Sequence, residues 1–128
     1  MTSPSPQNSP PLIGADQLIN LIGSARLDLS TEGAVQRGLA RLFEEDQVPY
    51  EAEVILAPSD RIDFLIGRVG IEVKIGHPRR AILRQLERYA RSDRVDALLL
   101  VSSAPFPSAG FELNGKTVHI VSLSTGWL

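Results

Sequence analysis

The sequence predicts an α/β fold in which helices flank a central mixed β-sheet within one domain. Three observations lead to this prediction. Residues 30–46 have helical periodicity, three short segments between residues 50 and 75 have strand patterns, and a helix beginning at residue 78 precedes two further strands. Elements in this order pack as a sandwich around one sheet. The chain length of 128 residues allows a single core of this kind.

Composition excludes several classes of protein. Apolar residues make up 43% and charged residues 22% of the chain, both ordinary values for a soluble globular domain. No apolar run approaches the ~18 residues of a membrane-spanning helix. The N-terminus lacks the basic-then-apolar order of a signal peptide, so we expect a cytoplasmic protein with no membrane partner. With no cysteine and two distant histidines, the chain favours neither a thiolate site nor a histidine-based zinc site.

Two segments precede the expected core. Residues 1–11 contain four prolines and three serines and almost nothing apolar, so we expect a disordered arm, with the single domain spanning residues 12–128. From Asp16 to about Leu27 the pattern favours a short amphipathic helix that is broken near Gly23.

The first long helix carries an unusual carboxylate. Ser30 is a good N-cap, and we expect the helix to run to about Asp46. A carboxylate on the apolar stripe of a helix is costly unless it is paired or binds a cation. A second interpretation is that Glu32, in the first turn, interacts favourably with the helix dipole. The stripe on which Glu32 falls is formed by Val35, Leu39, Leu42 and Phe43.

The remaining elements are assigned from alternation, apolar runs and turn residues. Gly67-Arg68-Val69-Gly70 separates two strands and indicates a tight hairpin. The near-continuous apolar run that ends at Ser102 is typical of a strand buried on both faces. The expected elements are strands at Tyr50–Leu56, Arg61–Ile66 and Ile71–Ile75, a helix from Pro78 to about Arg94, and strands at Val95–Ser102 and Lys116–Leu123.

The hairpin places three polar side chains on one face. A two-residue turn at residues 68–69, or a four-residue loop over residues 67–70, pairs Asp63 with Lys74. The same register pairs Leu65 with Glu72, and a turn one residue earlier keeps the same faces. In either case Asp63, Glu72 and Lys74 project from one side. The other side is filled by Ile62, Phe64, Ile66, Ile71, Val73 and Ile75.

Two carboxylates beside an ammonium group are the components of a divalent-metal site with its own base or charge stabiliser. Carboxylate oxygens suit Mg²⁺ or Mn²⁺, which also bind water and substrate phosphate. A bound cation polarises a phosphodiester and lowers the pKa of a water molecule. The lysine then orients or deprotonates that water, or neutralises charge that develops on the phosphate oxygens. The alternative interpretation is a solvated sheet face with a cross-strand ion pair.

The residues that form this pattern resemble the motif of the PD-(D/E)xK nuclease superfamily. Asp63 is followed by eight residues and then by Glu72-Val73-Lys74, between apolar strands. In that superfamily a helix before the first strand often supplies a further acidic ligand, and Glu32 matches this role. Many members also carry a glutamine and a tyrosine on the helix after the lysine strand, as Gln85-Leu86-Glu87-Arg88-Tyr89 does. The resemblance covers about residues 30–123 and implies a restriction-endonuclease-like αβββαβ fold.

One departure from the superfamily leaves the first ligand open. The Pro-Asp pair of the motif is absent, and Ile62-Asp63 stands in its place. Pro58-Ser59-Asp60 offers a second candidate, Asp60, although this residue precedes the expected strand.

The resemblance implies a Mg²⁺- or Mn²⁺-dependent deoxyribonuclease, endonucleolytic rather than exonucleolytic. A core of this size resembles resolvase-like and restriction-like endonucleases, which commonly act as homodimers. Lys74 is implied to position the attacking water, with Asp63 and Glu72 as its catalytic neighbours. Gln85 and Tyr89 are implied to contact substrate or a water near it. The implied ligands of one or two ions are Glu32, Asp63, Glu72 and the backbone carbonyl of Val73.

Positive charge is concentrated in one helix. The formal net charge is −2, but residues 79–94 carry six arginines and a net charge of +4, so the remainder carries −6. On a helical wheel five of them form an outward stripe, with Gln85 beside the buried face. The five are Arg80, Arg84, Arg88, Arg91 and Arg94. The plain interpretation is a solvated helix face. The functional interpretation is contact with DNA phosphates or with an acidic partner protein. The substrate-binding candidates on this stripe are Arg80, Arg84 and Arg88.

A different class of function stays open. The same fold serves equally as a non-catalytic nucleic-acid-binding or subunit-interaction module, which the acidic overall balance favours. An enzyme acting on RNA would carry the same residue types. The complete set of Asp63, Glu72 and Lys74 favours the enzyme. Glu53 and His77 are additional candidates beside the site, with plain alternatives as a strand-edge carboxylate and a loop histidine.

Overall fold

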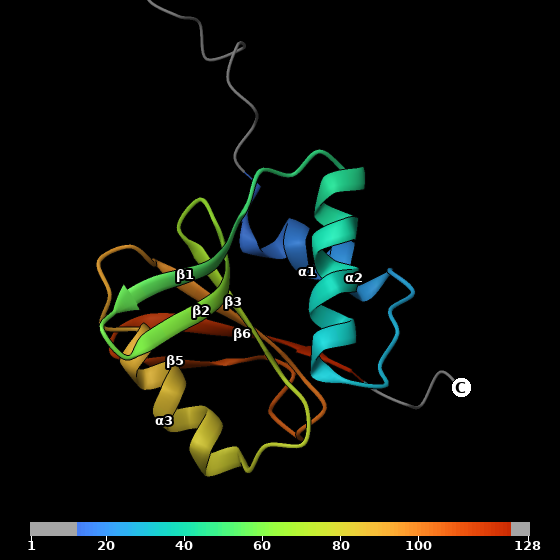
Figure 1. The fold of residues 1–128 in the computed structure, drawn as a ribbon. Helices are drawn as coiled ribbons and strands as arrows, with labels where there is room; N and C mark the ends of the chain where they lie inside the picture. The colour runs from blue at the N-terminus through green and yellow to red at the C-terminus, as the bar shows by residue number, and fades with distance from the viewer. Residues whose placement is uncertain (1–12, 124–128) are drawn as a thin grey trace, which may run out of the picture.

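The computed structural model describes residues 13–123, which form three helices and six strands. The arm expected at residues 1–11 lies outside the described residues. The predicted mixed α/β class is confirmed (Figure 1). In chain order the elements are α1 (Ala15–Gly23), α2 (Glu32–Glu45), β1 (Glu51–Ala57), β2 (Asp60–Ile66), β3 (Val69–Lys74), α3 (Arg79–Tyr89), β4 (Ala97–Ser102), β5 (Phe111–Leu113) and β6 (Lys116–Ser122).

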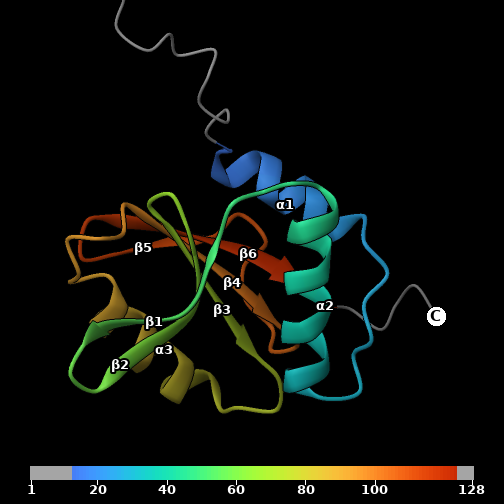
Figure 2. The same cartoon turned by 45° about the horizontal axis from the view of Figure 1, so that its top comes forward.

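The six strands form one sheet in the order β1-β2-β3-β4-β6-β5. Strand β2 pairs antiparallel with both β1 and β3. Strands β3, β4 and β6 run parallel, and β5 returns antiparallel to β6. Helices α1 and α2 cover one face, and α3 covers the other (Figures 1 and 2). Strand β4 is buried on both faces, as its apolar run predicts.

The β2–β3 hairpin adopts the second of the two expected registers. Ile66 pairs with Val69, so the turn is the two residues Gly67 and Arg68 rather than residues 68–69. Gly67 has a φ of 59°, a conformation that costs glycine little because it has no Cβ. The pairing of Asp63 with Lys74 expected from the later turn is therefore wrong. With the earlier turn, each β2 residue pairs with a β3 residue two positions before the one expected from the later turn. Side chains alternate along a strand, so a shift of two residues leaves each of them on the same face.

The apolar side chains of β2 do not all lie on one face of the hairpin. Phe64 packs in the core under α1 and α2, but Ile62 packs in the core under α3. The same change of face occurs in β1 between Tyr50 and Val54. Between them lies Glu53, whose φ of 54° bends the strand sharply. The placement of Ile62 with Phe64 on one face is therefore wrong, and Asp63 lies where the hairpin bends.

Two helix boundaries differ from the expectation. Helix α2 begins at Glu32 with Thr31 as its N-cap, because the Thr31 hydroxyl accepts the Ala34 amide at 3.0 Å. Ser30 instead donates its amide to Asp28, at 2.9 Å. Helix α3 ends at Tyr89 rather than near Arg94.

The early end of α3 has a tertiary cause. The segment after Tyr89 turns back toward the β2–β3 turn, where Arg68 donates to the Asp93 carbonyl and pairs with Asp96 at 2.8 Å. The amide of Asp96 also donates to the Arg68 carbonyl, at 2.7 Å. These contacts link residues distant in sequence, so helical periodicity alone does not reveal them.

Strand β5 was not predicted. It lies in the segment expected to be a loop, and the two residues Asn114 and Gly115 connect it to β6. Both have positive φ, 49° and 77°, as a hairpin turn of the Asn-Gly type requires. The Asn-Gly pair in the sequence was the signal for this hairpin.

Candidate active site

The candidate site lies where β2 and β3 separate. Backbone pairing between the two strands ends at Phe64 and Ile71. Beyond this point hydrogen bonds to side chains take the place of backbone pairing between the strands. The Asp63 amide donates to Glu72 Oε1 at 3.2 Å, and the Val73 amide donates to Asp63 Oδ2 at 2.8 Å. Each carboxylate thus satisfies a backbone amide that the parted strands leave free. The fork brings Asp63 and Glu72 together.

Lys74 and Tyr89 complete the surroundings of Glu72. Lys74 Nζ lies 3.0 Å from Glu72 Oε2, and the two side chains are only 13% and 4% exposed. The Tyr89 hydroxyl lies 3.3 Å from the same oxygen and 2.8 Å from the Arg61 carbonyl. The cluster is therefore buried, unlike the solvated sheet face of the alternative interpretation. Tyr89 is itself fully buried and holds Glu72 from the α3 side.

Burial and like charge both act on the two carboxylates. Burial, followed by the charge of Asp63, raises the pKa of Glu72 from 4.5 to about 7, although Lys74 opposes the shift. Burial also raises the pKa of Asp63, against the lowering effects of the Val73 amide, Gln36 and Lys74. The same burial and the nearby carboxylates raise the pKa of the Tyr89 hydroxyl. Two buried carboxylates side by side are thus poorly compensated by one lysine.

The donor chemistry of this cluster fits a hard divalent cation. Asp63 and Glu72 supply carboxylate oxygens, the ligands that Mg²⁺ prefers, and an added positive charge would offset their mutual repulsion. Within residues 13–123, however, no group of three or more histidine, aspartate or glutamate side chains is arranged to hold a metal ion. Both Glu72 oxygens instead accept hydrogen bonds from the protein.

Glu32 lies at the margin of the cluster. Its Oε1 accepts the amide of Ile75 at 2.9 Å and lies 2.9 Å from His77 Nε2. These contacts dock the first turn of α2 onto the segment that follows β3. Its charge raises the pKa of Asp63, so the two carboxylates interact electrostatically. Glu32 is thus paired, and its role as a metal ligand remains a prediction, as does that of the Val73 carbonyl.

Asp60 is held elsewhere. Its Oδ1 accepts Arg88 Nε at 2.8 Å, and the aspartate side chain is only 10% exposed. This ion pair, with a half-exposed Arg88, attaches α3 to the start of β2. Of the two aspartates considered, Asp63 is the one in contact with Glu72 and Val73.

The remaining candidates on α3 are Gln85 and the arginines. Gln85 is half-buried, one helical turn before Tyr89. Arg80 and Arg84 are exposed and line a groove of about 490 Å³ with Leu83 and Leu113. The remaining arginines of residues 79–94 have partners: Arg88 pairs with Asp60, Arg91 with Glu87, Arg94 with Glu51, and Arg79 lies over the ring of Phe106.

A hollow that the sequence analysis missed reaches the cluster from the α2 side. It has a volume of about 280 Å³, and Asp63 lines it together with Gln36, Arg37 and Arg61. Gln36 lies close enough to the Asp63 carboxyl to lower its pKa. It lies one helical turn after Glu32, so the helical wheel that singled out Glu32 also places Gln36 near the same face. Glu53 borders the hollow and pairs with Arg61 at 3.2 Å.

Comparison of the chain with protein-family models, with curated proteins and with solved structures gives no match. In the described part of the chain, no helix is long and apolar enough to cross a membrane.

Proposed function

We propose that this chain is a Mg²⁺-dependent nuclease that cleaves DNA phosphodiester bonds endonucleolytically, on a restriction-endonuclease-like core. The observation that carries the proposal is the buried cluster at the β2–β3 fork, where Asp63 and Glu72 lie together with Lys74. Burying two carboxylates side by side costs folding free energy, so such a pair is a candidate for a functional site rather than a stabilising one.

The order of the elements supports the same proposal. A helix, three antiparallel strands, a second helix and a parallel strand follow one another from α2 to β4. This is the αβββαβ order that the superfamily resemblance implies. It brings the first half of β2, the end of β3 and the buried side of α3 to one place.

The side chains of the cluster have different proposed roles in catalysis. Asp63 and Glu72 offer carboxylate oxygens, and Glu32 and the Val73 carbonyl are the proposed additional ligands. When bound, Mg²⁺ polarises a phosphodiester and lowers the pKa of an attacking water. Lys74, anchored at 3.0 Å on Glu72, presents N–H donors to that water or to a phosphate oxygen that gains charge.

A non-catalytic module on the same fold is the competing proposal. The acidic excess outside α3 favours it, since such a surface binds DNA weakly without specific contacts. The nuclease is preferred because a binding module has no need for two buried carboxylates with raised pKa values.

Cleavage assays distinguish the two proposals. Supercoiled, linear and branched DNA are incubated with the purified chain and Mg²⁺ or Mn²⁺, with a chelator as the negative control. Lys74→Ala and Glu72→Gln are expected to abolish cleavage while retaining the circular dichroism spectrum of the parent chain. Undiminished cleavage in either variant would overturn the assignment of the site, and absence of cleavage with either metal would favour the binding module.

A further inference from the structure

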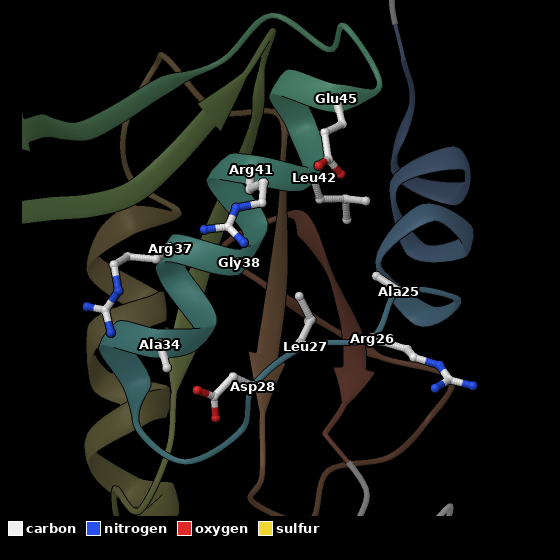
Figure 3. A pocket seen from close by; sticks show the side chains of 10 residues that line it. All are labelled: Ala25, Arg26, Leu27, Asp28, Ala34, Arg37, Gly38, Arg41, Leu42 and Glu45. Carbon is white, nitrogen blue, oxygen red and sulfur yellow. The ribbon is translucent and has the colours of Figure 1, made fainter.

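The hollow at Asp63 leads onto a basic groove along α2. Arg37 lines the hollow and also lines a second depression of about 450 Å³ between α2 and the segment before it. Figure 3 shows Arg37 and Arg41 on successive turns of α2, with Leu27 and Asp28 across from them. Arg37 therefore lies between the hollow beside the candidate catalytic cluster and this groove.

In this groove the Leu27 side chain packs closely against the α2 backbone at Gly38. Gly38 lies between the two arginines, and a Cβ there would come within 3.0 Å of Leu27 Cδ2. Glycine inside a helix costs ~1 kcal/mol relative to alanine, and here its missing side chain admits Leu27 against α2. Leu27 and Leu42 form an apolar floor beneath the charged rim.

The rim of this groove holds three arginines, of which Arg37 lies near enough to Asp28 to interact with its charge. Within residues 13–123, Arg26, Arg37 and Arg41 form no ion pair. Two carboxylates also line the groove, Asp28 and Glu45, which leaves one net positive charge. The carboxylate of Asp28 already accepts the Ser30 amide at 2.9 Å. In Figure 3, Arg26 extends away from α2, at the outer edge of the groove.

The arginine stripe of α3 compares poorly with this face. Arg88, Arg91 and Arg94 are paired with carboxylates. Arg80 and Arg84 have no such partner among the residues that the structure describes, but the groove that they line includes none of the cluster residues. The α2 groove, in contrast, has Arg37 in common with the hollow at Asp63.

We infer that the phosphate backbone of a DNA substrate lies along the α2 face, held by Arg37 and Arg41, with Gln36 beside the phosphate nearest Asp63. This inference rests on the proposed nuclease function and names its substrate-binding surface. Arginine guanidinium groups bind phosphate oxygens in a bidentate manner. Side chains at i and i+4 lie ~5–6 Å apart at Cβ, so Arg37 and Arg41 reach neighbouring phosphates of one strand.

Binding measured without cleavage tests the inference. Fluorescence anisotropy of a labelled DNA duplex in chelator gives the affinity and its salt dependence for the parent chain, for the double variant Arg37→Gln/Arg41→Gln and for Arg80→Gln/Arg84→Gln. Both variants remove the same charge. The α2 variant is expected to lose about tenfold or more in affinity and to lower the salt slope by about 2. The α3 variant is expected to lose several-fold less.

The outcomes separate this inference from the proposed function. An equal or larger loss in the α3 variant, no binding of DNA by the parent chain, or tighter binding of an RNA duplex would overturn the inference. The first and third of these results leave metal-dependent cleavage untouched. Conversely, if the α2 variant alone loses affinity but no metal supports cleavage, the binding surface stands and the proposed catalysis fails.

Discussion

The raised pKa of Glu72 predicts how the stability of the metal-free protein depends on pH. In the folded chain its pKa rises from 4.5 to about 7, because the carboxyl is buried beside Asp63. Between these two values the folded state binds more protons than the unfolded state, so the free energy of unfolding falls as pH rises. One pKa unit corresponds to ~1.4 kcal/mol. Glu72 alone therefore lowers stability by about 3 kcal/mol between pH 4.5 and pH 7.5.

Glu72→Gln isolates this contribution. The amide has the size of the protonated carboxyl but does not ionise, so the variant lacks the fall. Urea unfolding in chelator, followed by circular dichroism at several pH values, gives the free energy of unfolding of both proteins. The difference between variant and parent is expected to grow in favour of the variant by about 3 kcal/mol from pH 4.5 to pH 7.5.

An exposed carboxyl serves as the control for Glu72→Gln. Glu112 is exposed on β5, so Glu112→Gln is expected to follow the parent chain at every pH. If Glu72→Gln also follows the parent chain, Glu72 is not a strained buried carboxyl, and the electrostatic argument for the site is refuted.

Three further predictions concern metal binding, packing and assembly. Millimolar Mg²⁺ at pH 8 is expected to raise the melting temperature of the parent chain but not of Asp63→Asn, and a matching rise in both would remove Asp63 from the ligand set. Gly70→Ala is expected to cost about 1–3 kcal/mol in urea unfolding, because its Cβ would come within 2.5 Å of Ile62 Cδ1; Gly23→Ala, which meets nothing within 4 Å, is the matched control. Light scattering is expected to give twice the chain mass of 13.9 kDa, and a monomer at high concentration would contradict the proposed homodimer.

Much of the fold follows from local patterns in the sequence. Periodicity of two places β2 and β3, and the intervening Gly67 indicates their turn. The alternation of faces then brings Asp63 and Glu72 to one place whichever of the two turns forms, because a shift of two residues preserves the face. The apolar run of β4 predicts a strand that is buried on both faces.

The parts that were missed depend on long-range contacts or on overlooked turn residues. The bend at Glu53 has no local signal, since glutamate rarely adopts a positive φ. The end of α3 is set by Arg68, which lies 28 residues before its partner Asp96. The local signal for strand β5 was the hairpin-turn pair Asn114-Gly115.

The substrate-binding surface was also harder to predict than the cluster. Six arginines in one helix attract attention in a sequence, whereas the structure shows that several of them are paired with carboxylates. In the sequence, Arg37 and Arg41 do not stand out as a basic cluster. Its significance emerges only when α2 lies beside Asp63, as the shared lining of the two depressions shows.

Conversion of supercoiled plasmid to nicked or linear DNA in Mg²⁺, compared between the parent chain and Lys74→Ala, tests the central claim most directly. We expect metal-dependent conversion by the parent chain and none by the variant, with both proteins folded. Equal conversion by the two would contradict the assignment of Lys74 and Glu72 as the active site, and no conversion by the parent chain on any DNA form would contradict the nuclease itself.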